Sequence, residues 1–310
     1  MKVLVTGGRG FIGARLVDHM FSAGADVRVL DDGSRGTAQL PQGIEVVEGD
    51  VRDGEVARVA CRGVDVVAHF AAVQGTRNFY EKPDIVLDVN LRGVLNLAQA
   101  CADEHVGRLV FASSSEVYGI PTTFPTPESE PLVIPDPTNP RWSYSASKIA
   151  GELVVIHNAR RHDFEYVVLR YHNVYGPAMG LDHVVPQFIQ RLVTGQEFVV
   201  QGDGTQRRAY CYVDDVLGPT AKALSANEAA NAIYNVGNPA EEYSVAELIR
   251  VLERVIGRRI AARYTPFDQA GTSRRLPDVA RAERVLGLNP CVGLEEGLRR
   301  TYDWYASHLE

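Results

Sequence analysis

A glycine-rich turn near the N-terminus constrains the fold of this chain more than any other feature. An apolar run at residues 3–5 predicts a strand, and the sequence TGGRGFIG at residues 6–13 follows it directly and opens an amphipathic helical pattern. Glycines at this spacing permit a tight turn, a close backbone approach to a diphosphate and close packing of the helix on the strand. The pattern therefore predicts a dinucleotide cradle, with cofactor contacts expected at Gly7, Gly10, Phe11, Ile12 and Gly13.

Acidic residues at the ends of the next two predicted strands refine the cofactor prediction. Asp31 lies roughly 20 residues beyond the glycine turn, where a carboxylate accepts hydrogen bonds from the ribose hydroxyls of the adenosine. Its charge would repel a 2′-phosphate, so the sequence favours NAD over NADP, although Arg35 nearby could weaken that preference. Asp50 and Val51 end the third predicted strand, where the adenine is expected, and Asp50 could instead be only a strand-end cap.

Strands and helices alternate along the first part of the chain. Apolar runs of strand length occur at residues 3–5, 26–30, 44–47, 64–70, 109–112 and 166–170, and long helical patterns at 83–104 and 144–161. This alternation predicts the α/β class, with a Rossmann-type doubly wound parallel sheet that gathers ligands at the carboxyl ends of its strands. The pattern loosens after residue 170, where helices are expected near 184–194, 215–226 and 245–256 and strands near 198–200 and 209–213.

This change of pattern predicts two domains. Residues 1–170 are expected to form a Rossmann domain that binds NAD, to which a later strand near 232–236 returns. Residues 171–310 are expected to form a smaller, mixed domain that binds the substrate. The segment 121–140 is rich in proline and acidic residues, and we expect it to be a surface loop over the site because a helix follows it at once.

Tyr144 and Lys148 are the first candidates for catalysis. They are four residues apart in a predicted helix, so both side chains lie on one face. A phenol titrates near pH ~10, but a lysine ammonium one turn away and the positive nicotinamide of an oxidised cofactor would stabilise its phenolate. Tyr144 could then take a proton from a sugar or alcohol hydroxyl, and Ser114, at the end of the fifth predicted strand, would hold the same oxygen.

Composition excludes several other classes of function. The chain has 310 residues, of which 45% are hydrophobic, and its net charge of −7 argues against nucleic acid or an anionic membrane as the main partner. No apolar run approaches the ~18 residues of a membrane span, and the N-terminus enters the first strand directly, unlike a signal peptide. The four cysteines show no paired spacing, so we expect reduced thiols and a cytoplasmic protein with no metal site.

Six motifs together point to a known family. They are TGGRGFIG at 6–13, HFAA at 69–72, SSSEVYG at 113–119, YSASK at 144–148, RYHNVYGP at 170–177 and GDGTQRR at 202–208. In this combination the chain resembles the NAD-dependent nucleotide-sugar epimerase/dehydratase family, whose members are extended short-chain dehydrogenases/reductases. The resemblance covers nearly the whole chain. It implies a tightly bound NAD that is recycled, and transient oxidation of C4 of a nucleoside-diphosphate sugar to a 4-keto intermediate.

The resemblance also implies roles for individual residues. It implies that Tyr144 is the base and that Lys148 binds the nicotinamide ribose and tunes Tyr144. It also implies that Ser114 hydrogen-bonds the C4 oxygen of the sugar. The remaining expected contacts are with the cofactor at Phe70, Ala71 and Ala72, and with the substrate, chiefly its diphosphate, at Asn173, Arg208 and Arg275.

Glu116 bears on which reaction of the family to expect. The resemblance extends to 4,6-dehydratases and UDP-glucuronate decarboxylases, which carry a glutamate before Val-Tyr-Gly, and in a dehydratase this residue removes the C5 proton. Ser115 departs from the aspartate that many dehydratases have there, but a serine is found in some of them and in the decarboxylases. The stretch that includes Arg141 also resembles these decarboxylases. Arg141 could meet a carboxylate, although an exposed loop arginine is the simpler interpretation.

Several alternatives stay open at this point. Glu116 slightly favours dehydration or decarboxylation, and a UDP-sugar 4-epimerase is the alternative. Two more distant possibilities are a non-catalytic NAD-binding sensor and a reductase of other substrates with an exchanging cofactor. The helices expected at 83–104 and 144–161 could pair across a two-fold axis, as they often do in the family, so we also expect a homodimer.

Overall fold

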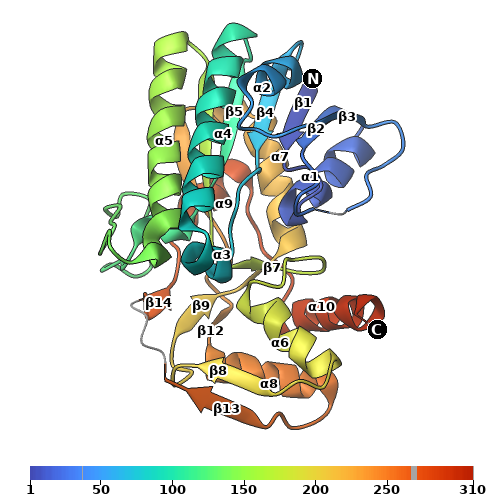
Figure 1. The fold of residues 1–310 in the computed structure, drawn as a ribbon, viewed down its shortest axis with the longest axis vertical. Coiled ribbons are helices and arrows are strands. Elements are labelled where there is room, and N and C mark those ends of the chain that lie inside the picture. Colours follow the sequence, from blue (N-terminus) through green and yellow to red (C-terminus); the bar gives the residue numbers. More distant parts are fainter. Residues whose placement is uncertain (37, 267–270, 310) are drawn as a thin grey trace.

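A seven-stranded parallel sheet forms the centre of the molecule (Figure 1). The computed structural model describes residues 1–36, 38–266 and 271–309. The strand order is β11-β6-β5-β4-β1-β2-β3, and it reverses direction between β1 and β4, which confirms the predicted doubly wound sheet. The strands are β1 (Lys2–Thr6), β2 (Asp26–Asp31), β3 (Glu45–Glu48), β4 (Val66–His69), β5 (Arg108–Ser114), β6 (Glu165–Tyr171) and β11 (Ala232–Val236).

Helices cover both faces of this sheet. They are α1 (Phe11–Ser22), α2 (Gly54–Cys61), α4 (Pro83–Asp103), α5 (Ser143–His162), α7 (Leu217–Ser225) and α9 (Ala280–Leu286), while the short α3 (Thr76–Glu81) packs against α4 at the carboxyl end of the sheet. Alternate residues of β1 point to opposite faces, so Val3 and Val5 pack with α1 and α7, whereas Leu4 packs with α2, α4 and α5. Figure 1 shows α4 and α5 side by side along one flank. The two faces therefore have separate apolar cores.

The rest of the chain lies beyond the carboxyl ends of the strands (Figure 1). Its three small sheets have the orders β10-β7, β12-β9-β14 and β13-β8. The elements are β7 (Val174–Tyr175), α6 (Val184–Val193), β8 (Phe198–Gln201), β9 (Arg207–Ala209), β10 (Cys211–Tyr212), β12 (Glu242–Ser244), α8 (Val245–Ile256), β13 (Ala262–Thr265), β14 (Arg274–Arg275) and α10 (Leu294–His308). No helix in the described ranges is long and apolar enough to span a membrane.

One predicted strand of this region is wrong. The run at 209–213 is divided between β9 and β10, because the backbone N–H of Tyr210 donates to Glu241 while the strands on either side pair with different partners. The strand expected near 232–236 lies in the central sheet as β11, beside β6. One apolar core runs from β1 through Tyr175 and Cys211 to α8, so the division at residue 170 stays a prediction.

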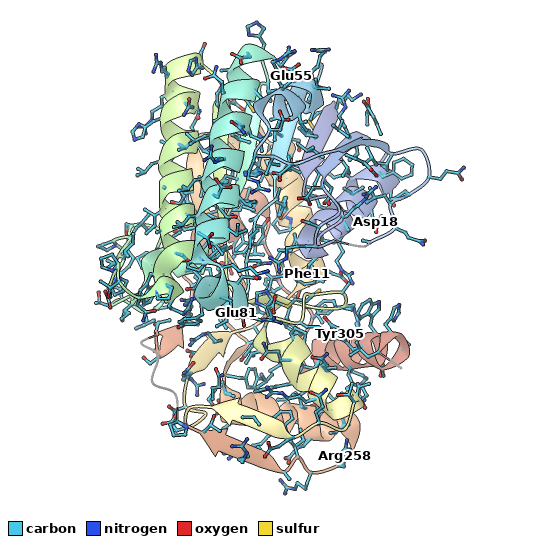
Figure 2. All side chains as sticks on the ribbon, viewed as in Figure 1. Phe11, Asp18, Glu55, Glu81, Arg258 and Tyr305 are labelled. Atoms are coloured by element: carbon cyan, nitrogen blue, oxygen red, sulfur yellow. The ribbon has the colours of Figure 1, made fainter. Side chains whose placement is uncertain are left out.

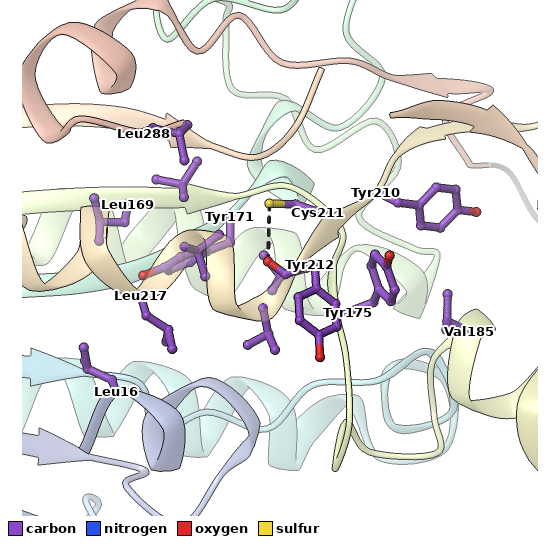
Figure 3. Packing of buried hydrophobic residues seen from close by; sticks show 14 of the residues in the cluster. Leu16, Leu169, Tyr171, Tyr175, Val185, Tyr210, Cys211, Tyr212, Leu217 and Leu288 are labelled. Carbon is purple, nitrogen blue, oxygen red and sulfur yellow. Dashed lines mark hydrogen bonds between the residues drawn. The ribbon is translucent and has the colours of Figure 1, made fainter. Parts of the chain in front are cut away.

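Tyrosine side chains fill the junction between the sheet and the C-terminal elements (Figure 3). Tyr175 makes edge-to-face contacts with Tyr210 and Tyr212, with ring centroids 6.2 and 5.8 Å apart. Cys211 is buried among them, and its Sγ lies 3.7 Å from the carbonyl oxygen of Tyr212. This packing fixes β7 and β10 next to the carboxyl end of β6, where several of the expected site residues lie.

The loop expected at 121–140 connects the sheet to the C-terminal part. Within it, the N–H of Thr126 donates to the carbonyl of Leu276 (2.7 Å), and the N–H of Asp278 donates back to Thr126 (2.9 Å). These bonds fasten the loop to the segment that follows β14. Arg275, the last residue of β14, is thereby held close to the end of β5.

Candidate active site

The glycine turn has no room for side chains. Gly7 has a φ of +69°, and a Cβ atom on it would lie 2.7 Å from the backbone nitrogen of Ala71 at the end of β4. A Cβ on Gly13 would lie 2.1 Å from the carbonyl oxygen of Gly7. The helix α1 begins at Phe11 (Figure 2), and within the described ranges no side chain caps it at Gly10. Its first N–H groups therefore remain available to an anion, which fits a dinucleotide diphosphate.

Asp31 keeps acceptor positions open at the end of β2, where the sequence predicts the adenosine ribose. Its carboxylate accepts the backbone N–H groups of Arg9 (2.9 Å) and Gly33 (2.8 Å) at the end of β2. A carboxylate has about four acceptor positions, so about two remain for ribose hydroxyls. The guanidinium of Arg35 donates to the carbonyl of Gln74 (2.7 Å), and in the described part of the chain no hydrogen bond joins it to Asp31. The geometry thus gives no support to the idea that Arg35 weakens the preference for NAD.

The other expected cofactor contacts lie at the ends of β3 and β4. Ala71 donates its N–H to the hydroxyl of Thr6 (3.3 Å), and Phe70 and Ala72 flank it at the edge that faces the glycine turn. Val51 is buried. Asp50 is ion-paired to Arg52, with 2.6 Å between Oδ2 and Nη2, and accepts the Arg52 N–H at 2.8 Å. These contacts suit a strand-end cap, and the contact of Asp50 with the adenine stays a prediction.

Tyr144 and Lys148 lie together on α5, and both are buried. The Nζ atom of Lys148 lies 5.7 Å from the centre of the Tyr144 ring and donates to the carbonyl of Ala112 at 2.7 Å. Burial raises the pKa of Tyr144 and the charge of Glu116 adds to this, while a hydrogen bond with Ser114 opposes it. Burial also lowers the pKa of Lys148 to about 7. A further positive charge, such as an oxidised nicotinamide, is needed to make Tyr144 a base at neutral pH.

Two elements hold the catalytic candidates against each other. Ser114 ends β5, and its hydroxyl accepts the N–H of Glu116 (3.2 Å) to begin a 3-10 helix over Ser115–Tyr118, in which Ser115 is buried. The hydroxyl of Ser145 on α5 donates to the carbonyl of Glu116 (2.7 Å). The ring of Phe79, from α3, stacks on Tyr144 with centroids 5.1 Å apart. The structure thus brings Ser114 and Tyr144 to one site.

The carboxylate of Glu116 is held by two arginines. Arg275 donates from Nη1 and Nη2 to its two oxygens at 2.5 and 2.6 Å, and Nη2 of Arg141 lies 3.0 Å from each. Burial would raise the pKa of Glu116, but the charges and hydrogen bonds of the two arginines outweigh it and hold that pKa well below its usual range. Such a carboxylate is a weak base, so the geometry does not favour Glu116 as the base that removes a C5 proton.

The simple interpretation of Arg141 as an exposed loop residue is wrong. Its side chain is only 13% exposed, and its guanidinium lies 5.6 Å from the ring centre of Phe79 as well as against Glu116. The helix α3, which carries Phe79, is only six residues long and gave no periodic signal in the sequence. Sequence reasoning therefore missed the contact between Phe79 and Tyr144.

Arg208 and Arg275 form a second unusual pair. They are register partners on the parallel strands β9 and β14, and Arg208 donates to the carbonyls of Arg207 (2.8 Å) and Thr272 (2.9 Å). Burial, and then the charge of Arg275, lowers the pKa of Arg208 to about 10, so it is still charged at neutral pH. Like charges on neighbouring strands repel each other. This pair therefore favours a bound anion.

The arginine cluster carries unused hydrogen-bond donors. Nη1 of Arg141 and Nε of Arg275 are buried and have no partner in the described part of the chain. Arg141, Arg208 and Arg275 bring three positive charges and Glu116 one negative charge, which leaves the cluster at +2. Buried donors without a partner are rare, so they indicate a ligand position. The cluster is suited to a ligand with more than one negative group.

Asn173 follows the carboxyl end of β6, between β6 and β7. Its φ of 41° is in the left-handed region, which asparagine tolerates better than most residues, and its Nδ2 donates weakly to Ala209 at 3.4 Å. Its side chain is thus free to meet a ligand beside β9. In the ranges that the structure describes, no group of three or more His, Cys, Asp or Glu side chains could hold a metal ion.

Known proteins share both the sequence and the fold. A model of the NAD dependent epimerase/dehydratase family matches residues 3–237. A Methanocaldococcus jannaschii protein with a provisional UDP-glucose 4-epimerase name is 34% identical over 97% of both chains. UDP-glucuronic acid decarboxylase 1 of Xenopus tropicalis is 30% identical over 100% of this chain and 73% of its own. A Thermotoga maritima UDP-glucose 4-epimerase solved with UDP-glucose covers 100% of both chains at 31% identity, with a TM-score of 0.91. The protein is therefore an enzyme of the NAD-dependent epimerase/dehydratase family.

Proposed function

We propose that this enzyme oxidises C4 of a UDP-hexuronate and then releases the sugar carboxylate as carbon dioxide. The observation that carries the proposal is the binding of the Glu116 carboxylate by Arg141 and Arg275, because the same fork of donors suits the carboxylate of a uronate. The name of the Xenopus relative, a UDP-glucuronic acid decarboxylase, supports it. The family alone would not select this substrate from other nucleotide sugars.

Substrate binding follows from the charges of the site. Arg208, from the proposed substrate domain of residues 171–310, and Asn173 would meet the diphosphate. Arg141 and Arg275 would meet the uronate carboxylate through the donors that now lack a partner. Such a substrate brings about three negative charges to a cluster with a charge of +2, and planar guanidinium groups bind phosphate and carboxylate in bidentate fashion. The diphosphate supplies about two of these charges, and the carboxylate adds the group that the unpartnered donors of Arg141 and Arg275 would bind.

Oxidation at C4 is the task of Tyr144, Lys148 and Ser114. Ser114 would hold the C4 hydroxyl, and Tyr144 would take its proton through the phenol oxygen. The glycine turn and Asp31 would hold NAD, which would supply the hydride acceptor for this oxidation. In its ammonium form Lys148, which lies beside the Tyr144 ring, would favour the phenolate that this step requires. Phe79 keeps the phenol ring in place by stacking on it.

Decarboxylation then needs little from the protein. Oxidation at C4 places a ketone β to the carboxylate, so the electrons of the C5–C6 bond move into the ketone as carbon dioxide leaves. The resulting enolate takes a proton at C5, and the restored ketone is reduced at C4. No step requires a carboxylate base with a raised pKa, whereas a 4,6-dehydration does. This difference agrees with a Glu116 whose pKa is held low.

The first test is a substrate panel. The purified enzyme is incubated with UDP-glucuronate, UDP-glucose and dTDP-glucose in heavy water, and the products are read by mass spectrometry. We expect UDP-glucuronate to lose the mass of carbon dioxide and to gain one deuterium at C5, while the two neutral sugars are turned over slowly or not at all. Loss of water from dTDP-glucose would instead establish a dehydratase and overturn the proposal.

A 4-epimerase is the second candidate. Epimerase names among the relatives, such as those of the Methanocaldococcus and Thermotoga proteins, favour it, and it also needs no base at C5. Rapid interconversion of UDP-glucose with an isomer of unchanged mass and no deuterium would establish it. The same outcome with UDP-glucuronate would keep the uronate specificity but replace decarboxylation by epimerisation. The panel therefore separates the substrate from the reaction.

We also propose a cytoplasmic homodimer that pairs through α4 and α5. Leu95 on α4 and Leu153 on α5 are 51% and 55% exposed, and four unpaired cysteines suit a reducing compartment.

The substitution Leu153→Asp is expected to produce monomers, because it would bury two charges in the interface. Light scattering after gel filtration measures the mass. Phe21→Asp, at an exposed apolar residue of α1, is the matched control and is expected to stay dimeric. A dimer that survives Leu153→Asp would rule out this face.

A further inference from the structure

A buried ion pair lies directly behind the catalytic helix, between Glu152 on α5 and Arg170 on β6. Each side chain is only 3% exposed, and Nη2 and Nε of Arg170 lie 2.7 and 2.9 Å from the two Glu152 oxygens. The hydroxyl of Ser113 also donates to Glu152 at 2.5 Å. Glu152 thereby fastens α5 to β6 and to the residue before Ser114. It lies one helical turn beyond Lys148 and two beyond Tyr144.

Stability alone does not explain this pair. The desolvation of two buried charges offsets most of their attraction, and well-packed apolar residues of similar volume often replace such pairs without loss. Neither side chain has a part in substrate binding or in the oxidation step described above. Arg170 also donates to the hydroxyl of Tyr118 (2.9 Å) and to the carbonyl of Glu128 (2.9 Å), so all its charged end is engaged within the protein. A role toward the neighbouring catalytic groups is the remaining use.

The surroundings of Lys148 show which group Glu152 acts on. On its own helix, Lys148 has Tyr144 one turn before it and Glu152, also buried, one turn after it, and from β5 it faces the Phe111 ring, whose centre is 4.7 Å from Nζ. From β4 it faces His69, which burial keeps neutral by lowering its pKa to about 3. Arg170, on β6, is bound to Glu152. Among the described residues Glu152 is thus the carboxylate that acts on the Lys148 ammonium.

We propose that Glu152 is a positioning residue whose charge, moderated by Arg170, keeps Lys148 in the ammonium form that Tyr144 requires. The proposal rests on the proposed roles of Tyr144 and Lys148. Burial alone drives Lys148 toward its neutral form, and Glu152 is the group that opposes this. Arg170 donates to both Glu152 oxygens and so limits the pull of Glu152 on the proton of Lys148.

The test follows the titration of Lys148 itself, so it does not depend on the identity of the substrate. The chain has four lysines, and side-chain NMR of enzyme with carbon-13-labelled lysine, loaded with NAD, resolves them, with Lys148→Met as the assignment variant. In Glu152→Gln, which keeps the shape and removes the charge, the midpoint for Lys148 is expected to fall by about one pH unit. This is the order expected of a partly neutralised charge one turn away at an effective dielectric constant of about 20.

Matched variants separate charge from packing. Glu165→Gln removes the ion pair between Glu165 on β6 and Arg108 on β5, at the opposite end of β6 from Arg170, and it is expected to leave the Lys148 midpoint in place. Glu152→Asp keeps the negative charge, so the Lys148 midpoint in this variant is expected to lie close to the wild-type value. Arg170→Gln removes the cation that is paired with Glu152 and is expected to raise the midpoint of the Lys148 titration. This variant tests the proposal even if Glu152→Gln does not fold.

Turnover gives a second readout. With the sugar nucleotide that the substrate panel identifies, the pH profile of kcat in Glu152→Gln is expected to move to lower pH, since loss of an anion lowers the pKa values of the Tyr144–Lys148 pair. A Lys148 midpoint that stays within about 0.2 units of the wild-type value in folded Glu152→Gln would overturn the proposal. That result would not contradict the proposed reaction. Conversely, if no sugar of the substrate panel is turned over, the NMR titration of Lys148 still tests the role of Glu152.

Discussion

Replacing Tyr144 with phenylalanine will lower kcat by at least about a hundredfold, the lower end of what a positioned general base contributes. The substitution removes the oxygen that would take the C4 proton and keeps the ring. Because the ring carries the stacking contact with Phe79, we expect the fold to be preserved. The glycine turn and Asp31 are untouched, so NAD is expected to stay bound. Initial rates, melting temperature and the NAD content of denatured protein measure the three quantities.

The control for this variant is a buried tyrosine outside the site. Tyr234 on β11 is almost fully buried, and its hydroxyl donates to the carbonyl of Ala229 at 3.2 Å. Tyr234→Phe removes a hydroxyl of the same kind and is expected to change stability slightly and kcat by less than about twofold, as for a modest hydrogen bond far from the chemistry. If Tyr144→Phe retains turnover within a few-fold of the wild type, Tyr144 is not the base.

The local motifs were the part of the molecule that the sequence predicted well. The glycine spacing depends on contacts between neighbouring residues, and the four-residue interval of Tyr144 and Lys148 needs only a helix to put both on one face. The helix expected at 144–161 is α5, Ser143–His162, and the one expected at 245–256 is α8, Val245–Ile256. The helix α8 begins at the Ser244–Glu247 capping box and ends at Gly257, and α5 ends at Asp163 in the left-handed region.

The contacts that could not be predicted join distant parts of the chain. Glu116 and Arg275 are 159 positions apart, and no periodic pattern connects a residue after β5 with one on a two-residue strand. Arg141 lies in a proline-rich loop, which composition alone places at the surface, yet it is drawn inward by Glu116 and Phe79. The charge state of Glu116 depends on these partners, so the sequence could name the residue but not its chemistry.

Replacing Arg275 with glutamine will weaken the binding of UDP-glucuronate about a hundredfold, which corresponds to about 2.7 kcal/mol. Arg275 is expected to bind the uronate carboxylate through Nε, the donor that now lacks a partner, and truncating one partner of a buried charge pair costs about 2–5 kcal/mol. Binding of UDP, which lacks the sugar, is expected to weaken far less, because Arg208 and Asn173 remain. Calorimetric titration with both ligands measures the difference.

Arg274 provides the matched control. It precedes Arg275 on β14, but its guanidinium is ion-paired with Glu242, with Nε 2.6 Å from Oε1, and its side chain is partly exposed. Arg274→Gln therefore removes the same charge from the same strand without touching Glu116, and we expect little change in the affinity for either ligand. A loss of UDP binding in Arg275→Gln as large as the loss of UDP-glucuronate binding would show that Arg275 serves the diphosphate. The carboxylate would then have to be recognised by Arg141, which Arg141→Gln tests with the same two ligands.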